Sequence, residues 1–171
     1  MARFGFMIAA IVAAAVLGAV IGPGRALAAC TDPPAPGVNW QRCGFDGLDL
    51  TGVDLSGARL LDGSFFRSDL SDGDLSKTNS FRAKFVNAVL REAKLDGAKL
   101  SEADFTKADL TGASFKGADL RRARFFHAIL RRVDLTDARL KGADLTRADL
   151  SGATWIDGKR VCAEGSLGRC N

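Results

Sequence analysis

A run of five arginines within residues 121–132 is the segment of this chain with the clearest capacity for binding chemistry. The run contains no acidic residue, and it includes His127, the one histidine of the chain. The five arginines are Arg121, Arg122, Arg124, Arg131 and Arg132. Basic, partly aromatic surfaces bind phosphates and other polyanions, so these residues form a candidate anion patch. The alternative is an ordinary solvated face that Asp119 and Asp134, on either side, partly neutralise.

Aspartate recurs at ten positions, each directly before a large apolar residue. Examples are Asp49, Asp69, Asp109, Asp134 and Asp149. Regularly spaced carboxylates suggest calcium binding or acid catalysis. However, a short acceptor beside a tight turn hydrogen-bonds nearby backbone N–H groups. We therefore expect these aspartates, and the Ser or Thr residues that follow, to stabilise turns.

Catalysis finds little support in this composition. The chain has one histidine and no tyrosine, and no Ser-His-Asp or Cys-His set is brought together by its spacing. The four cysteines of the chain lack zinc-site spacing and have no histidine beside them. The sequence also has no glycine-rich phosphate loop. We expect a non-enzymatic protein with no cofactor and no metal.

The elements that must position these side chains follow a five-residue period. From residue 45 to residue 155 every fifth residue is large and apolar, with one exception at Ser80. Of these 23 positions 15 are Leu, six are Phe and one is Trp155, and the residue two places earlier is Ala at 15 of them. Neither the 3.6-residue period of a helix nor the two-residue period of a strand keeps this pattern on one face. A chain that turns a corner every five residues does, and short fixed periods are typical of solenoids.

The unit Ala108-Asp109-Leu110-Thr111-Gly112 resembles the pentapeptide-repeat family, whose consensus is A-(D/N)-L-x-x. The resemblance covers about two thirds of the chain without a slip in register. It implies an all-β fold, a right-handed quadrilateral β-helix with about 20 residues per coil and five to six coils over residues 45–155. Glycines two positions after the large apolar residue, such as Gly112, suit the corners because glycine adopts backbone conformations that other residues avoid.

In a coil of this length, residues 20 positions apart lie above one another, and several apolar residues then fall on outward columns. Phe66, Val86 and Phe126 share one column, and Leu61 and Phe81 share the adjacent one. Exposed apolar side chains on neighbouring faces are a candidate partner surface, made of Leu61, Phe66, Val86 and Phe126. Alternatively, Phe66 and Phe126 cover a corner, and Phe81 turns inward to fill the core position before it.

The N-terminal residues resemble an export signal. Arg3 is followed by an apolar run over residues 4–21, a Gly-Pro-Gly-Arg break, and Ala26-Leu27-Ala28, which fits a cleavage site. We expect a signal peptide over residues 1–28, with cleavage after Ala28 or after Ala29. The alternative is an uncleaved anchor, since about 18 apolar residues approach the ~20 that span a bilayer.

Four cysteines accompany this signal, namely Cys30, Cys43, Cys162 and Cys170. Exported proteins use disulfides as staples. Sequence proximity suggests Cys30 with Cys43 and Cys162 with Cys170, although four cysteines allow three pairings. Residues 27–30 also fit a bacterial lipobox, in which Cys30 carries a lipid. Lipidation would leave one of the other cysteines unpaired, so two disulfides are the simpler account.

Four segments follow from these patterns: the signal peptide, a Pro-rich cap over residues 29–44, the repeat over residues 45–155 and a C-terminal cap over residues 156–171. Both caps close an open end of the solenoid, and Trp40 is placed to cover the first coil.

Charge and compartment limit the choice of partner. Loss of Arg3 and Arg25 with the signal lowers the net charge from +4 to +2, because 22 basic residues then face 20 acidic ones. The resemblance includes strongly acidic cytoplasmic proteins that mimic DNA and protect gyrase, and this chain lacks both properties. We therefore expect no binding to DNA or gyrase, and no membrane span after processing.

The expected function is that of a secreted or periplasmic bacterial protein, a rigid binding or scaffolding module without enzymatic activity. Its expected partner is an envelope protein or a second copy of the chain. The alternative is a membrane-anchored lipoprotein with a structural role, held by a lipidated Cys30.

Overall fold

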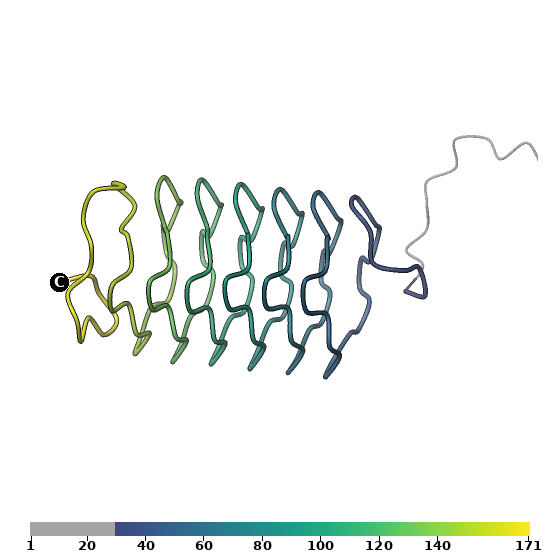
Figure 1. Ribbon diagram of the computed structural model, residues 1–171, viewed down its shortest axis with the longest axis horizontal. Helices are drawn as coiled ribbons and strands as arrows, with labels where there is room; N and C mark the ends of the chain where they lie inside the picture. The colour runs from purple at the N-terminus through teal and green to yellow at the C-terminus, as the bar shows by residue number, and fades with distance from the viewer. Residues whose placement is uncertain (1–29) are drawn as a thin grey trace, which may run out of the picture.

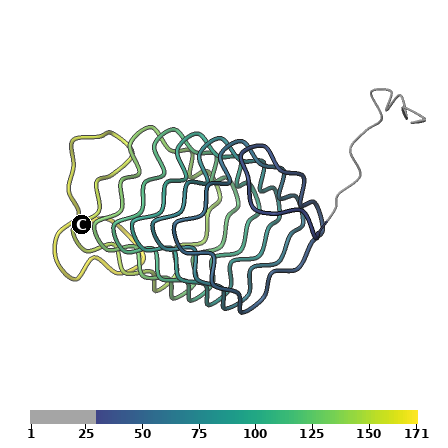
Figure 2. The ribbon, with the colours of Figure 1, turned by 45° about the vertical axis from the view of Figure 1, so that its right-hand side comes forward.

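The structure is a computed structural model that describes residues 30–171, and the predicted signal peptide over residues 1–28 lies outside these residues. Within this range the chain winds into a rod of stacked coils, and the two ends of the described chain lie at opposite ends of the rod (Figure 1). Turned by 45°, the coils lie behind one another with similar outlines (Figure 2). Residues 30–171 contain no helix and no strand longer than a single bridge residue, so the coils are the structural elements.

Parallel backbone pairs at every fifth residue join one coil to the next. The residue before each centre pairs with the residue 20 positions later, from Asn39 with Arg59 to Asp134 with Thr154. These bridge positions run from 39 to 154 in steps of five, which makes 24 units and six coils. The fold is the right-handed quadrilateral β-helix that the repeat predicts, and its ladder includes one unit before residue 45.

Each unit consists of a small residue, a bridge residue, a centre residue and two outer residues, in that order. In the unit centred on Leu70, the N–H of Leu70 donates to the carbonyl of Val89 (2.7 Å) and that of Asp72 to the carbonyl of Arg91 (2.8 Å), both in the next coil. The second outer residue makes the corner with a positive φ, which is 53–61° at 15 non-glycine residues. Gly112, with a φ of 72°, is an example of the residue that this corner favours.

Centre residues fill the core, and one column of them is aromatic. Five fully or nearly buried phenylalanines succeed one another with ring centroids 4.9–5.4 Å apart, and they are Phe45, Phe65, Phe85, Phe105 and Phe125. Each stacked pair adds about 0.5–1.5 kcal/mol beyond the burial of its area. The stack therefore couples five successive coils along the rod axis.

The N-terminal end of the rod is closed as the sequence predicts. Cys30 and Cys43 form a disulfide. Trp40 is almost fully buried, with its ring centroid 4.1 Å from that of Phe45, and its Nε1 donates to the backbone carbonyl of Asp32 (3.2 Å). The Pro-rich segment is thus tied to the first coil by a disulfide and by hydrogen bonds, which include that of the Gly37 N–H to the carbonyl of Ser56 (2.8 Å).

The C-terminal end is closed by a segment that folds back on the last coil. After Thr154 the chain reverses and pairs antiparallel with itself, as in the bridge between Thr154 and Val161. Cys162 and Cys170 form the second predicted disulfide. An open coil edge would present unpaired backbone groups, and the returning segment satisfies part of that edge.

Candidate functional site

A groove of about 870 Å³ lies over one column of first outer residues. The column consists of Leu61, Phe81, Ser101, Arg121 and Lys141, at 20-residue spacing. Ser101 is much smaller than its neighbours in the column, so the surface dips between Phe81 and Arg121. We refer to this hollow as the groove.

The groove has an apolar end and a charged end. Leu61 and Phe81 are half-buried at the apolar end, and Asn79 and Ser101 contribute polar groups beside them. The charged side chains that line it are Lys99, Glu102, Asp119, Arg121, Arg122 and Lys141. Four cations thus face two carboxylates, which gives the groove a net positive charge.

Asp119 holds Arg121 in a fixed orientation. Arg121 Nε donates to Asp119 Oδ1 (2.8 Å), and Arg121 Nη2 donates to Asp119 Oδ2 (2.6 Å). The hydrogen bond from the Arg121 side chain, helped by the Arg121 N–H and the Ser101 hydroxyl, lowers the pKa of Asp119 to about 2 against the opposing effect of burial. The carboxylate therefore stays ionised throughout the physiological range.

The other three cations of the groove are less constrained. Arg122 Nη1 lies 3.6 Å from Glu102 Oε1, and the Arg122 side chain is 76% exposed, so this ion pair is weak. Lys99 and Lys141 have no acidic partner within 4.0 Å among residues 30–171. Two ammonium groups of the groove therefore have uncompensated charge.

The coil distributes the arginines of the candidate anion patch over three faces. Arg121 and Arg122 line the groove, whereas Arg124 lies on the next face and pairs with Asp104 (3.3 Å). The chain turns a corner between these residues, so neighbours in sequence point in different directions. Only part of the arginine run therefore contributes to any one surface.

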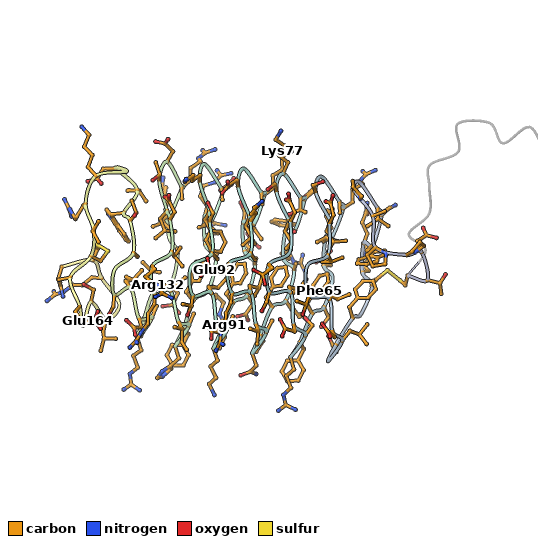
Figure 3. All side chains as sticks on the ribbon, in the orientation of Figure 1. Phe65, Lys77, Arg91, Glu92, Arg132 and Glu164 are labelled. Carbon is orange, nitrogen blue, oxygen red and sulfur yellow. A yellow bond between two sulfur atoms is a disulfide. The ribbon has the colours of Figure 1, made fainter. Side chains whose placement is uncertain are left out.

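The last two arginines lie beside a second hollow of about 610 Å³. Arg131 Nε is 2.5 Å from Asp149 Oδ2, whereas Arg132 has no ion pair within the described chain. Figure 3 shows Arg132 on the same side of the rod as Glu92, which lines the same hollow. Of the two flanking acids, Asp119 pairs within the run, but Asp134 pairs with a lysine outside it (3.1 Å).

The candidate partner surface is also divided. Phe66, Val86 and Phe126 lie half-buried in one column, and Leu61 lies in the neighbouring column at the apolar end of the groove. Thr106 interrupts the phenylalanine column, and its hydroxyl is buried with no hydrogen-bond partner in residues 30–171. The column is thus a partly covered apolar strip with one polar break.

Phe81 does not turn inward. Ser80 is fully buried, and its Oγ donates to Thr78 Oγ1 (3.0 Å), which in turn donates to the carbonyl of Leu75 (2.9 Å). Thr78 is larger than the alanine usual at its position, so the two hydroxyl residues occupy the space that Ala and Leu occupy elsewhere. The alternative of an inward Phe81 is therefore wrong, and this ring stays at the groove.

The aspartates close turns, as predicted. All ten accept the N–H of the first outer residue two positions later, at 2.8–3.3 Å. In the unit centred on Leu70, this is the Ser71 N–H, the one that does not donate to a backbone carbonyl. Hydrogen bonds from the Thr146 side chain and N–H lower the pKa of Asp144 for the same reason.

Two further features bear on chemistry. His127 lies at the surface with Nε2 3.4 Å from Arg147 Nη1. Among residues 30–171 no three His, Cys, Asp or Glu side chains are grouped so as to hold a metal ion. The same part of the chain has no helix that is long and apolar enough to cross a membrane.

Sequence reasoning missed Lys99, Glu102 and Lys141 as neighbours of Arg121. They lie about one coil away in sequence: Lys99 is 20 residues before Asp119, Glu102 is 20 residues before Arg122, and Lys141 is 20 residues after Arg121. The projection that groups the apolar residues into columns also brings these charged residues together, and it aligns the five stacked phenylalanines.

A family model described as "Pentapeptide repeats" matches residues 43–79, 83–122 and 118–154 in eight copies. A search of curated proteins finds no match.

Several solved structures are similar to this chain. HetL from the cyanobacterium Nostoc sp. strain PCC 7120, a pentapeptide repeat protein involved in heterocyst differentiation regulation, is 31% identical over 72% of this chain and 70% of its own, with a TM-score of 0.45. Rfr23 from the cyanobacterium Cyanothece 51142 is 26% identical over 68% of this chain and 90% of its own, with a TM-score of 0.48. QnrB1, a plasmid-mediated fluoroquinolone resistance protein, is 21% identical over 69% and 67%, with a TM-score of 0.48.

Proposed function

Because this chain belongs to the pentapeptide-repeat family, we propose that it is a rigid, non-enzymatic binding module that acts outside the cytoplasm and presents the groove to a ligand. The observation that carries this proposal is the pair of uncompensated ammonium groups, Lys99 and Lys141, in a groove with one apolar end on a regular rod. An uncompensated charge at a concave surface favours a ligand of opposite charge.

Rigidity follows from the way the rod is built. Successive coils pair through their bridge residues on each of the four sides, and the core is filled by side chains that pack along the axis and across the coil, as Phe105 does against Phe125 and Phe115. Groups such as Arg121, fixed by Asp119, therefore keep their positions before a ligand arrives. A preformed site loses little conformational entropy on binding.

A location outside the cytoplasm is supported by the cysteines. All four are paired in disulfides, Cys30 with Cys43 and Cys162 with Cys170. Such staples persist in oxidising compartments and are rare in the cytosol of mesophiles. The proposal adds that residues 1–28 direct export, to the periplasm or to the exterior of a bacterial cell.

Expression of the full chain in a bacterium, followed by fractionation and intact mass measurement, tests this location. We expect a mature chain that begins at Ala29 or Cys30 in the periplasmic or culture fraction, with a mass lower than that of the reduced chain by two hydrogen atoms for each disulfide. A diacylglyceryl mass on Cys30 would instead support the lipoprotein alternative. Retention of the unprocessed chain in the cytoplasm would contradict the proposal.

A second contact surface is suggested by the half-buried column of Phe66, Val86 and Phe126. We infer that this column, with Leu61 beside it, contacts a second copy of the chain or an envelope protein. Sedimentation of wild type and of the double variant Phe66→Ser with Phe126→Ser tests self-association. A dimer that persists in the double variant would rule the column out as its interface.

A further inference from the structure

We propose that the groove binds a linear acidic polysaccharide, an inference that rests on the proposed role of the chain as a binding module. The three features that lead to this ligand are the uncompensated cations, the pairing of the coils beneath the groove, and the length of the groove. Each constrains the ligand separately.

The charges require acidic groups on the ligand. Lys99 and Lys141 have no acidic partner within 4.0 Å in the described chain, and they lie on opposite sides of Arg121 along the column. Arg121 uses two of its donors on Asp119, and a guanidinium has five. A ligand with several carboxylates in a row would meet a cation at each of three successive coils.

The floor of the groove favours a sugar chain over a peptide. The groove crosses the coils, and the bridge residues beneath it each pair with a coil on both sides, as Asn79 pairs with Arg59 and Lys99. An extended peptide bound by strand addition lies alongside a strand at a sheet edge, whereas the coils beneath Phe81, Ser101 and Arg121 have no such edge.

Side chains must therefore supply the recognition, and their types suit a carbohydrate. The Glu102 carboxylate accepts hydrogen bonds from hydroxyl groups, the Asn79 amide both donates and accepts, and the Ser101 hydroxyl, which donates to Asp119, can still accept. Phe81 offers an apolar ring for the C–H face of a sugar. Hydroxyl groups, C–H faces and carboxylates occur together in acidic polysaccharides.

The shape of the groove favours a polymer over a membrane surface. The lining extends from Leu61 to Lys141, which is four coil steps, or roughly 19 Å at about 4.8 Å per step. Several sugar units fit along this length. A flat bilayer would reach the rim but not the floor between Phe81 and Arg121.

Calorimetric titration of the folded, disulfide-bonded chain with hexameric oligogalacturonate tests the proposal, with the methyl ester of the same hexamer as a ligand of equal length and no charge. We expect the acid form to bind and the ester to bind at least tenfold more weakly. The double variant Lys99→Gln with Lys141→Gln should bind the acid form at least tenfold more weakly than wild type.

The matched control is Lys77→Gln with Lys107→Gln, which removes the same charge from exposed lysines outside the groove. It should bind like wild type. Equal loss of binding in both double variants would overturn the proposal, because the attraction would then be a property of the net charge. Retained far-ultraviolet spectra and urea midpoints in both variants show that folding is intact.

Two competing ligands complete the test. Hexaglutamate that binds as tightly as oligogalacturonate would overturn the polysaccharide assignment in favour of an acidic peptide, while the binding module itself would stand. Vesicles of anionic phospholipid that compete with the sugar at Lys99 and Lys141 would overturn it in favour of a membrane surface. Absence of binding by all probes also overturns it, whereas the proposed location is tested separately by fractionation.

Discussion

Thr78 and Ser80 give a test of how this core is packed. Both are fully buried, and the Ser80 hydroxyl donates to Thr78 Oγ1 at 3.0 Å. They occupy the small and centre positions, where other units carry alanine and a large apolar residue. We predict that Thr78→Ala and Ser80→Leu are each destabilising alone, and that together they are at least as stable as wild type.

The expected magnitudes follow from burial. Thr78→Ala leaves the Ser80 hydroxyl without its partner, at about 1–3 kcal/mol for an unsatisfied buried group. Ser80→Leu alone crowds Thr78, and overpacking costs typically about 1–3 kcal/mol. The double variant removes both hydroxyls and buries a leucine side chain, which contributes about 1.5–3 kcal/mol. The coupling free energy should therefore be at least about 2 kcal/mol.

Urea unfolding with the disulfides intact measures these values. Trp40 and Trp155, the two tryptophans of the chain, follow the first and the last bridge residue of the parallel ladder and so report from opposite ends of the rod. The reverse exchange in the next coil is the control. Leu100→Ser should lower the free energy of unfolding by about 2–5 kcal/mol, as for other truncations of a core leucine. Addition of Ala98→Thr should restore part of this stability. Additivity within about 0.5 kcal/mol would refute a shared packing site for Thr78 and Ser80.

Three further sets of changes are expected to raise or lower the stability of the chain. Thr106→Val should stabilise the chain by about 1 kcal/mol, because it removes a buried hydroxyl without a partner, whereas Thr111→Val, which loses a 2.6 Å hydrogen bond, should destabilise it in the same urea assay. Asp119 has a pKa lowered to about 2, below its unfolded value of about 3.9, so its stabilisation is present above the unfolded value. That contribution is lost as the pH falls through the pKa of Asp119 in the folded state. Urea midpoints should therefore drop between about pH 5 and pH 2, and they should drop less in Asp119→Asn. Equal drops in the two proteins would contradict the assignment of this pH dependence to Asp119. Gly97→Ala should cost about 1 kcal/mol of stability, because φ is +64° at Gly97 and the added Cβ meets no clash. Lys77→Gly, one coil earlier at a φ of 57°, should stabilise the chain by up to about 1 kcal/mol. Thermal midpoints that move in the opposite directions would contradict the argument that these corners favour glycine.

Much of the fold was predictable because each unit repeats the same local problem. The five-residue period identifies the corner, the small residue and the core residue of every unit. The sequence identifies the aspartates as turn acceptors because a carboxylate two residues before a free N–H is a local arrangement. Both disulfides join cysteines that are close in sequence, Cys30 with Cys43 and Cys162 with Cys170.

The replacement of the core group at Ser80 was not predictable in the same way. An inward Phe81 and a hydroxyl pair with Thr78 both fit the sequence, and the choice depends on the volume left between neighbouring coils. That volume is filled by Thr78, so Phe81 remains at the surface. Packing decides such cases because interiors leave little empty space.

The sequence by itself therefore determined a rod of five-residue units with stapled ends, since those features depend on contacts within or next to one unit. Only the tertiary structure decided which surfaces exist. It separated Arg121 from Arg124, three residues apart, and brought Arg121 together with Lys99 and Lys141. The physical reason is the geometry of the coil. The chain turns at every fifth residue, so residues 20 positions apart in sequence lie side by side on successive coils. Ion pairs such as that of Arg124 with Asp104 form between such residues.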